Sequence, residues 1–249
     1  MKSPLISDSL RAFLRALPER ERYGPAELLV PELRIAQDPS LGLEIYDAPI
    51  GWQNPEARLA IIGVTPGFTQ MEIVVREVRR HLSLGASDDE ACRQAKYVAS
   101  FAGSMRVNLV RMLDELELPP LLGINSTADL FDSASHLLHT TSAVRHPVFR
   151  HGENYTGSRP RLVQAPVLLR YAREDLAPEL SSLRGAVYVP LGKSVAELLR
   201  LLETEGVIPS GRTLFGLPHP SAANGHRARQ FTEARERLRE ELAGILRSN

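Results

Sequence analysis

Short apolar runs that end in tight turns alternate with helical stretches along most of this chain. The runs are 57–63 (ARLAIIG), 135–144 (SHLLHTTSAV), 186–192 (AVYVPLG) and 213–220 (TLFGLPHP). Between them, apolar residues recur every three to four positions, which is the spacing of an amphipathic helix. Strands that alternate with helices predict an α/β protein whose short, mostly parallel central sheet is covered by helices on both faces.

The helical stretches have recognisable ends. Ser7 or Asp8 would cap the first helix and Pro18 would stop it, whereas Gly85 and Ser87 break the second stretch. The stretches that we expect to be helical are 5–17, 69–97, 105–116, 166–182, 194–206 and the C-terminal segment. In that last segment one stripe carries Phe231, Ala234, Leu238, Leu242 and Ile245. The stretch 145–161, rich in Gly, Pro and Arg, is expected to be a surface loop.

Charge and cysteine content limit the cellular setting. The 30 basic and 30 acidic side chains cancel, which argues against a nucleic-acid partner unless one face is basic. One cysteine, Cys92, allows no disulfide within the chain. The N-terminal stretch is interrupted by Arg11 and Arg15, so it resembles neither a signal peptide nor a membrane span. We therefore expect a cytoplasmic protein without a membrane partner. We also expect a monomer, although none of these features bears on the oligomeric state.

Three of the expected strands end in distinctive turns, at Gly63–Gly67, Ser142–His146 and His219–Asn224. In open parallel sheets, ligands bind beyond the carboxyl ends of the strands. These three turns would then converge on one rim, which is the strongest functional argument that needs no knowledge of families.

His219 has a proline on each side, and each proline restricts the backbone around it. A histidine held rigidly at a strand end can donate a hydrogen bond to a developing anion. Ser221 and Asn224 follow with a hydroxyl and an amide that could meet a phosphate. The competing interpretation is a plain tight turn in which Ser221 caps the final helix.

Several common sites are missing from the sequence. The turn 63–67 lacks the spacing of a dinucleotide fingerprint, and no phosphate loop, nucleophile elbow or zinc-protease pair is present. His136 and His139 fall in an expected strand, where they would face opposite sides, so we interpret them as structural. We expect neither a metal nor a cofactor.

Five short motifs appear in the order that characterises one superfamily. GVTPG (63–67), FAGSMRVNLVRML (101–113), TTSAVRHP (140–147), LGKSVAELL (191–199) and HPSAAN (219–224) together resemble the uracil-DNA glycosylase superfamily over about 57–230. The resemblance implies a single-domain, three-layer α/β/α sandwich over 1–249. An N-terminal helical extension would occupy 1–50, and a helical insertion would occupy 69–97.

The resemblance implies base excision, in which a nucleotide is flipped out of DNA and its N-glycosidic bond is cleaved by water without a metal. His219 would stabilise the departing base, Phe101 would stack on it and Ser221 would hold a backbone phosphate. The turn 63–67 would hold the attacking water and shape the floor of the pocket.

Other candidates follow from position in the same motifs. Val64 and Phe68 are expected to contact the base. Expected contacts to the DNA backbone are Asn224, Gly67, Lys193, Arg145 and Arg227. Ala223 stands where relatives insert a bulky wedge, so Arg227 or the loop 145–161 would take that role.

Two departures from the superfamily argue against uracil as the substrate. Val64 and Thr65 occupy the places of a catalytic Asp, Asn or Glu, which leaves Thr65 or Glu72 as candidate water activators. For Glu72 the simpler interpretation is a solvated helix residue. Ser142 stands where an asparagine reads the uracil edge, and a hydroxyl cannot make that two-bond contact. The smaller side chains favour a bulky or modified base, such as glycosylated hydroxymethylcytosine in phage DNA.

Three other functions remain open at this point. The chain could be an inactive module that binds DNA lesions, which the Thr65 departure favours. It could be a uracil or mismatch repair glycosylase. Its zero net charge also fits an unrelated α/β enzyme that processes nucleotides, with the loops 63–67 and 192–194 holding phosphate.

Overall fold

The computed structural model describes residues 4–183, 185–221 and 224–247. The chain divides into two compact units, each assembled from three separate segments. The first unit contains Met1–Trp52, Thr65–Ser100 and Val144–Thr156. The second unit contains Gln53–Val64, Phe101–Ala143 and Gly157–Asn249.

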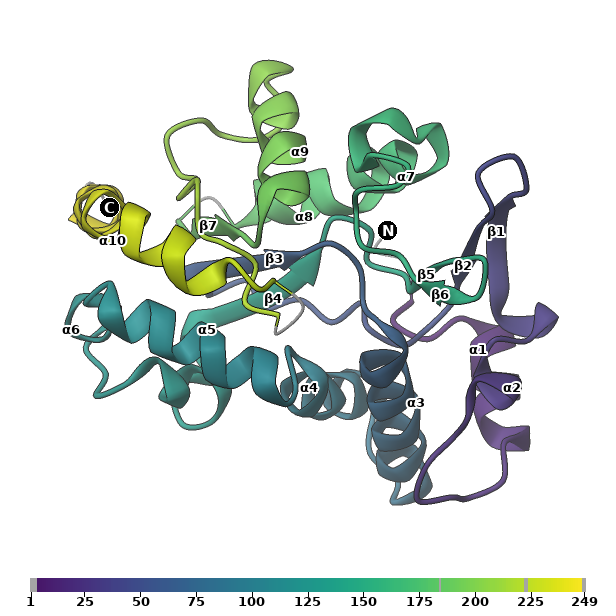
Figure 1. Cartoon of the computed structure of the whole chain (residues 1–249). Coiled ribbons are helices and arrows are strands. Elements are labelled where there is room, and N and C mark those ends of the chain that lie inside the picture. The colour runs from purple at the N-terminus through teal and green to yellow at the C-terminus, as the bar shows by residue number, and fades with distance from the viewer. Residues whose placement is uncertain (1–3, 184, 222–223, 248–249) are drawn as a thin grey trace. The chain divides into compact units, whose positions relative to one another are not determined.

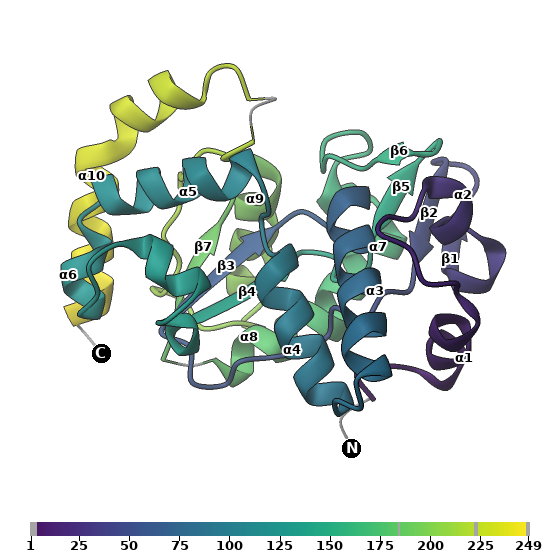
Figure 2. The ribbon, with the colours of Figure 1, turned by 90° about the horizontal axis from the view of Figure 1, so that it is seen from below.

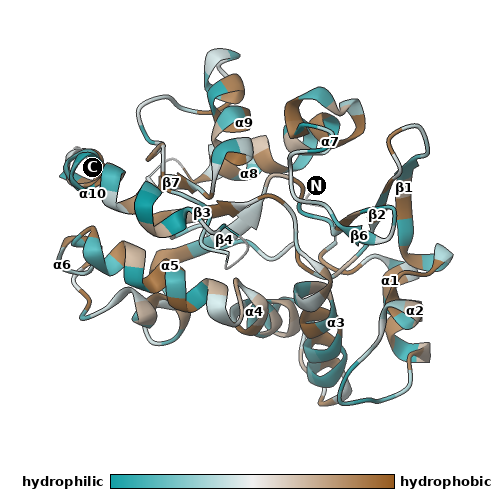
Figure 3. Cartoon of the chain, in the orientation of Figure 1, coloured by the Kyte–Doolittle hydropathy of each residue, from teal (hydrophilic) through white to brown (hydrophobic). Residues whose placement is uncertain are grey.

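A parallel three-stranded sheet forms the centre of the second unit, with β3 (Leu59–Gly63) between β4 (Leu138–Ser142) and β7 (Val187–Pro190) (Figure 1). All five residues of β3 are buried, and Figure 3 shows this strand as hydrophobic. The predicted short, parallel sheet is confirmed here.

Helices pack on both faces of this sheet because the side chains of β3 alternate between two apolar clusters. Leu59 and Ile61 belong to the cluster that includes α5 and α10. Ala60 and Ile62 belong to the cluster that includes α8 and α9. The helices of this unit are α5 (Ser104–Glu115), α6 (Leu118–Leu122), α7 (Pro166–Tyr171), α8 (Ala177–Ser182), α9 (Lys193–Thr204) and α10 (Arg227–Arg247).

Shorter helical turns connect these elements. Three are 3-10 turns, at Thr127–Phe131, Ser135–Leu137 and Leu162–Gln164. A π-helical turn, Ala172–Leu176, joins α7 to α8 within the stretch predicted as one helix. It lies just before Pro178, which has no N–H to donate along the helix, so the widened turn accommodates a missing hydrogen bond.

The strand predicted over 213–220 is wrong beyond its first residues. A single parallel bridge joins Thr213 to Tyr188, made by hydrogen bonds from Tyr188 N to Arg212 O and from Leu214 N to Tyr188 O, both 2.8 Å. Gly216 then takes a φ of 104°. Because Pro218 and Pro220 have no N–H, the ladder cannot continue.

The first unit contains a four-stranded antiparallel sheet in the order β1-β2-β5-β6 (Figure 2). Its strands are β1 (Arg34–Asp38), β2 (Leu43–Tyr46), β5 (Val148–Arg150) and β6 (Glu153–Asn154). Its helices are α1 (Asp8–Ala16), α2 (Pro25–Leu28), α3 (Phe68–Ser83) and α4 (Asp88–Ala99), with a 3-10 turn at Pro31–Leu33. One apolar cluster, centred on α3, α4 and α1, forms its core.

This antiparallel sheet corrects two predictions. The segment 1–50 is not purely helical, because it carries β1 and β2. The stretch 145–161 is not only a loop, because it carries β5 and β6. Each strand is at most five residues long, too short for an alternating pattern to stand out. The pairing of Ile45 with Val148 also joins segments that are far apart in sequence.

The predicted helices of the first unit are confirmed, although their ends differ by up to three residues from the predicted 5–17 and 69–97. Ser7, rather than Asp8, caps α1, since its Oγ accepts a hydrogen bond from Leu10 N at 3.2 Å. The stretch 69–97 is helical and breaks where expected, with Gly85 at a φ of 84° and Ser87 capping α4. Among the described residues, no helix combines the length and apolar character needed to cross a membrane.

Candidate functional site

The three parallel strands of the second unit end level with one another. Gly63, the last residue of β3, is the register partner of Ser142, the last residue of β4. Ala143 N donates to Gly63 O at 2.8 Å, and Leu191 N donates to Ile62 O at 2.9 Å. The carboxyl ends of all three strands therefore form one edge.

His219 lies at this edge, against the end of β7. Gly192 N donates to Leu217 O at 3.1 Å. A Cβ at Gly192 would stand 3.1 Å from His219 Cβ, and Gly192 also has a φ of 83°. Only glycine can adopt this positive φ and also leave space for His219 without strain. The strand-end residues Gly63 and Ser142 and the histidine thus belong to the same edge of the same unit.

The His219 ring is prepared to donate a hydrogen bond while neutral. Ser221 N donates to its Nδ1 at 3.2 Å. Because Nδ1 accepts this bond, the proton of the neutral ring lies on Nε2. Burial lowers the pKa of His219, so the neutral form dominates at pH 7.

Side chains from two helices hold the turn that carries His219. Asn108 of α5 donates through Nδ2 to Pro220 O at 3.0 Å. Arg227 of α10 donates through Nη1 to Pro220 O at 3.2 Å and to Ser221 O at 2.8 Å. Asn224 Nδ2 donates to His219 O at 3.3 Å. Arg227 and Asn224 therefore brace the turn itself, and their predicted contacts with DNA stay predictions.

Phe101 lies beside the strand ends in an unusual backbone conformation. Its φ is 52°, a left-handed value that costs a non-glycine residue about 1–3 kcal/mol and is concentrated at functional sites. Its Cε1 lies 3.5 Å from the position of a Cβ at Gly63, and Ser142 Oγ lies 3.6 Å from the same point. Only 6% of Phe101 is exposed, so it is a packed wall of the site, and stacking on a base stays a prediction.

Three more residues lie together near the start of α9: Val64, Gly157 and Ser194. A Cβ at Gly157 would stand 3.0 Å from Ser194 Cβ and 3.1 Å from Val64 Cγ1. Lys193 is the exposed first residue of α9, where the helix dipole adds positive potential. The sequence predicted Val64 and Lys193. It missed Asn108, Gly157 and Ser194, although a positive-φ glycine in a loop is the type of signal that could have revealed Gly157.

Five predicted site residues belong to the first unit: Thr65, Gly67, Phe68, Glu72 and Arg145. The Thr65 hydroxyl donates to His146 O at 2.7 Å and accepts from Val148 N at 3.1 Å. The single hydroxyl hydrogen of Thr65 is therefore used in the bond to His146 O, which holds the chain just before β5.

Gly67 and Phe68 begin helix α3. Phe68 N donates to Asn154 Oδ1 at 2.8 Å, and Gly67 N donates to Gln70 Oε1 at 3.2 Å. The Phe68 side chain packs against the apolar cluster of this unit. Both residues therefore have structural partners within the first unit.

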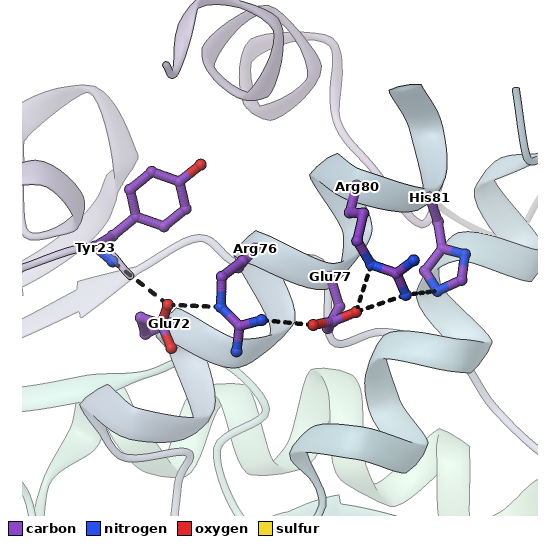
Figure 4. A network of polar contacts seen from close by, with 6 residues as sticks. All are labelled: Tyr23, Glu72, Arg76, Glu77, Arg80 and His81. Atoms are coloured by element: carbon purple, nitrogen blue, oxygen red, sulfur yellow. Dashed lines mark hydrogen bonds and ion pairs between the residues drawn. The ribbon is translucent and has the colours of Figure 1, made fainter. Parts of the chain in front are cut away.

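Glu72 is a buried, ion-paired residue, so its interpretation as a solvated helix residue was wrong. It is 7% exposed. Its Oε1 accepts from Arg76 Nε at 3.0 Å and from Tyr23 N at 3.4 Å, and Arg76 also contacts Glu77 (Figure 4). These bonds orient Glu72 within its own unit and favour a structural role.

Arg145 lies near Gly51 and Asp47 in the first unit. A Cβ at Gly51 would stand 3.7 Å from Arg145 Nη1. Burial raises the pKa of Asp47, and the charge of Arg145 opposes this rise. Ala223, at the position where relatives insert a wedge, lies outside the described residues.

His139 uses both of its ring nitrogens in structural contacts. Nδ1 accepts from Asn54 N at 3.2 Å, and Nε2 forms a short hydrogen bond with Glu179. His136 precedes the strand, in the 3-10 turn Ser135–Leu137, so the prediction that it faces away within a strand was wrong. In the described parts of the chain, no three His, Cys, Asp or Glu side chains form a group able to hold a metal ion.

Comparison with known proteins shows a similarity over most of the chain. No family model matches the chain. It is 37% identical over 239 residues to "Uncharacterized protein YoxB" of Bacillus subtilis (strain 168), and the match covers 93% of each chain. The chain belongs to the YoxB family. The uncovered remainder is much shorter than either compact unit, so the matched residues include parts of both. The name YoxB states no activity, and the glycosylase interpretation stays a prediction.

Proposed function

We propose that this YoxB-family chain is a DNA glycosylase-like enzyme that flips a modified or bulky base and hydrolyses its N-glycosidic bond. The observation that supports it most is the neutral His219 ring at the carboxyl edge of the parallel sheet. This edge is where α/β proteins bind their ligands, and a fixed hydrogen-bond donor there suits a leaving group that becomes negative.

The proposed reaction breaks the bond between C1′ of the deoxyribose and the base nitrogen. The electron pair of that bond leaves with the base, and His219 Nε2–H stabilises the resulting anion with a hydrogen bond. Water adds to C1′, and its proton finally neutralises the base. The products are a free base and an abasic site, with no metal or cofactor in the sequence of steps.

The side chains around the strand ends favour a large base over uracil. Ser142 and Gly63 are small and lie together beside Phe101. A hydroxyl at Ser142 offers one donor and cannot reproduce the paired contacts of an amide. A glycosylated hydroxymethylcytosine, as found in phage DNA, is our preferred substrate, and the enzyme would then act in defence against phage.

The test uses duplex oligonucleotides that carry uracil, hypoxanthine, hydroxymethylcytosine or its glycosylated form. We expect abasic sites, detected as alkali-labile breaks, with the glycosylated base. The His219→Ala variant should lower this rate by about 10²–10³-fold, the usual effect of removing a donor to a developing anion. His226→Ala is the matched control, since His226 is exposed, and it should retain the wild-type rate.

Each outcome separates the proposal from its rivals. Cleavage of the uracil duplex alone would make the chain a repair glycosylase. Absence of cleavage together with negligible DNA binding at low salt would favour a nucleotide-processing enzyme, because DNA binding should show a steep salt dependence.

A catalytically inactive DNA-binding module is the second candidate. The hydrogen bonds of Thr65 and Glu72 favour it, because these leave neither side chain available to activate water without rearrangement. Tight binding of a modified duplex without any base release would support this module over the enzyme.

A further inference from the structure

A cavity of about 770 Å³ lies in the second unit between helices α9 and α10. Part of the segment that connects these helices lines the cavity, and Thr213 of that segment forms a parallel bridge with Tyr188 of β7. The ribbon of this segment can be followed beside β7 in Figure 1. The lining residues of the cavity are Arg200, Ser210, Gly211, Arg212, Thr213, Phe215, Arg237, Glu241, Gly244 and Ile245. We call this cavity the arginine groove. None of the site residues discussed above lines it.

Positive charge dominates the described lining, with three arginines and one carboxylate. The carboxylate, Glu241, is already paired with Arg237 at 2.8 Å. Glu203, which adjoins the lining, accepts a hydrogen bond from the Thr213 hydroxyl. The charges of Arg200 and Arg212 therefore exceed the single negative charge of the adjoining Glu203, which leaves the groove positive.

The arginines are held in place by local structure. The Arg200 guanidinium lies 4.3 Å from the centre of the Phe215 ring, a stacked cation–π geometry. Arg212 donates to Gly185 O at 3.4 Å. Arg237 donates to Phe215 O at 3.3 Å, and a Cβ at Gly216 would stand only 2.5 Å from its Nη2. The glycine thus makes room for this arginine.

Small residues keep the groove open. A Cβ at Gly211 or Gly244 would have no atom within 4 Å. Gly244 lies inside α10, where glycine costs about 1 kcal/mol relative to alanine. It follows Arg237 and Glu241 on the same helix face, at spacings of seven and three residues. A helix glycine at this place fits a need for space in the groove.

We propose that the arginine groove binds a ligand carrying two or more phosphate groups in series. Guanidinium groups match phosphate oxygens in geometry and charge, and here they come from three different elements. The volume exceeds what a single inorganic ion fills and lies in the range of small-molecule sites. The ligand is either a free phosphorylated molecule, such as a nucleoside triphosphate, or the backbone of a nucleic-acid strand. This inference does not depend on the proposed glycosylase activity.

Calorimetric titration of the full chain with tripolyphosphate and with ATP tests the groove. We expect binding by the wild type and a loss of at least about tenfold in affinity in the Arg200→Gln/Arg212→Gln variant, which removes two charge-assisted contacts. Gly244→Leu, which fills the groove while keeping a good helix former, should weaken binding as well. Arg247→Gln removes one charge from α10 outside the groove and should change affinity less than about twofold.

A single-stranded oligonucleotide identifies the source of the phosphates. If it binds more tightly than tripolyphosphate and competes with it, the natural ligand is a nucleic-acid backbone. If it does not compete, the ligand is a free phosphorylated molecule. Arg247→Gln, outside the groove, should leave the binding of both compounds unchanged. The proposal is overturned if the wild type binds no phosphate compound, or if the double arginine variant binds as the wild type does.

Discussion

The pKa of a single buried histidine gives the clearest prediction at the scale of residues. Burial, reinforced by the nearby charge of Arg145, lowers the pKa of His146 to about 4 from an ordinary value near 6.5. Between these two pH values the unfolded chain binds more protons than the folded one. The free energy of unfolding therefore falls as the pH decreases from about 6.5 to 4, by on the order of 3 kcal/mol.

His146→Gln removes this titration and provides the comparison. Asp47, 3.7 Å from His146 and itself with a pKa raised by burial, opposes part of the loss at the acidic end. It remains in the variant, so the difference between the two proteins reports His146. Urea unfolding at pH 7, 6, 5 and 4 should show a steeper decline for the wild type. Parallel curves would mean that His146 has the same pKa in the folded and the unfolded chain, which would contradict the prediction.

At the scale of elements, one buried pair joins a strand to a helix. His139 of β4 and Glu179 of α8 are 1% and 3% exposed and hydrogen-bonded. Glu179→Ala leaves a buried ring nitrogen without this partner and should lower the free energy of unfolding by about 1–3 kcal/mol. The double variant His139→Leu/Glu179→Leu should recover part of that loss, because it removes the unpaired ring but also takes away the acceptor of Asn54 N. Urea unfolding at pH 7 measures both, and a double variant no more stable than Glu179→Ala would contradict the expectation.

Helices and parallel strands were accessible from the sequence because their signals are local. The stretch 105–116 was expected to be helical, and α5 spans Ser104–Glu115. The apolar run 57–63 was expected to contain a strand, and β3 spans Leu59–Gly63. The antiparallel sheet was missed because its strands are very short and β2 finds its partner β5 about a hundred positions later.

The same division applies to the candidate site: features that follow from local sequence were predictable, and contacts between remote segments were not. Gly63, Ser142 and His219 were expected at one edge, since parallel strands end on the same side of a sheet. The environments of Thr65 and Glu72 were not predictable. Their partners, His146 O and Tyr23 N, come from segments remote in sequence, and no spacing rule links them.

At the scale of the whole molecule, the path of the chain predicts one cooperative unfolding transition. The segments 65–100 and 144–156 of the first unit both interrupt the second. If the first unit unfolded alone, the second would have to close a long flexible loop over 65–100, at a cost of about 4 kcal/mol. That cost is comparable to the net stability of many domains.

The chain contains one tryptophan that can follow this transition. Trp52 belongs to the first unit and contacts Tyr97 at a ring distance of 5.8 Å. Its fluorescence reports the first unit, whereas far-ultraviolet circular dichroism reports the helices of both. The two signals should give the same urea midpoint. Midpoints that differ would show that the units unfold independently.

The pairing of β2 with β5 has a consequence during synthesis on the ribosome. The β2 strand, complete at Tyr46, must wait for Val148–Arg150 before its second edge is covered. At a translation rate of about 5–20 residues per second, this edge stays open for roughly 5–20 s. An unpaired strand edge can recruit other chains. The newly made N-terminal hairpin is therefore the part of the nascent chain where we expect a chaperone to bind.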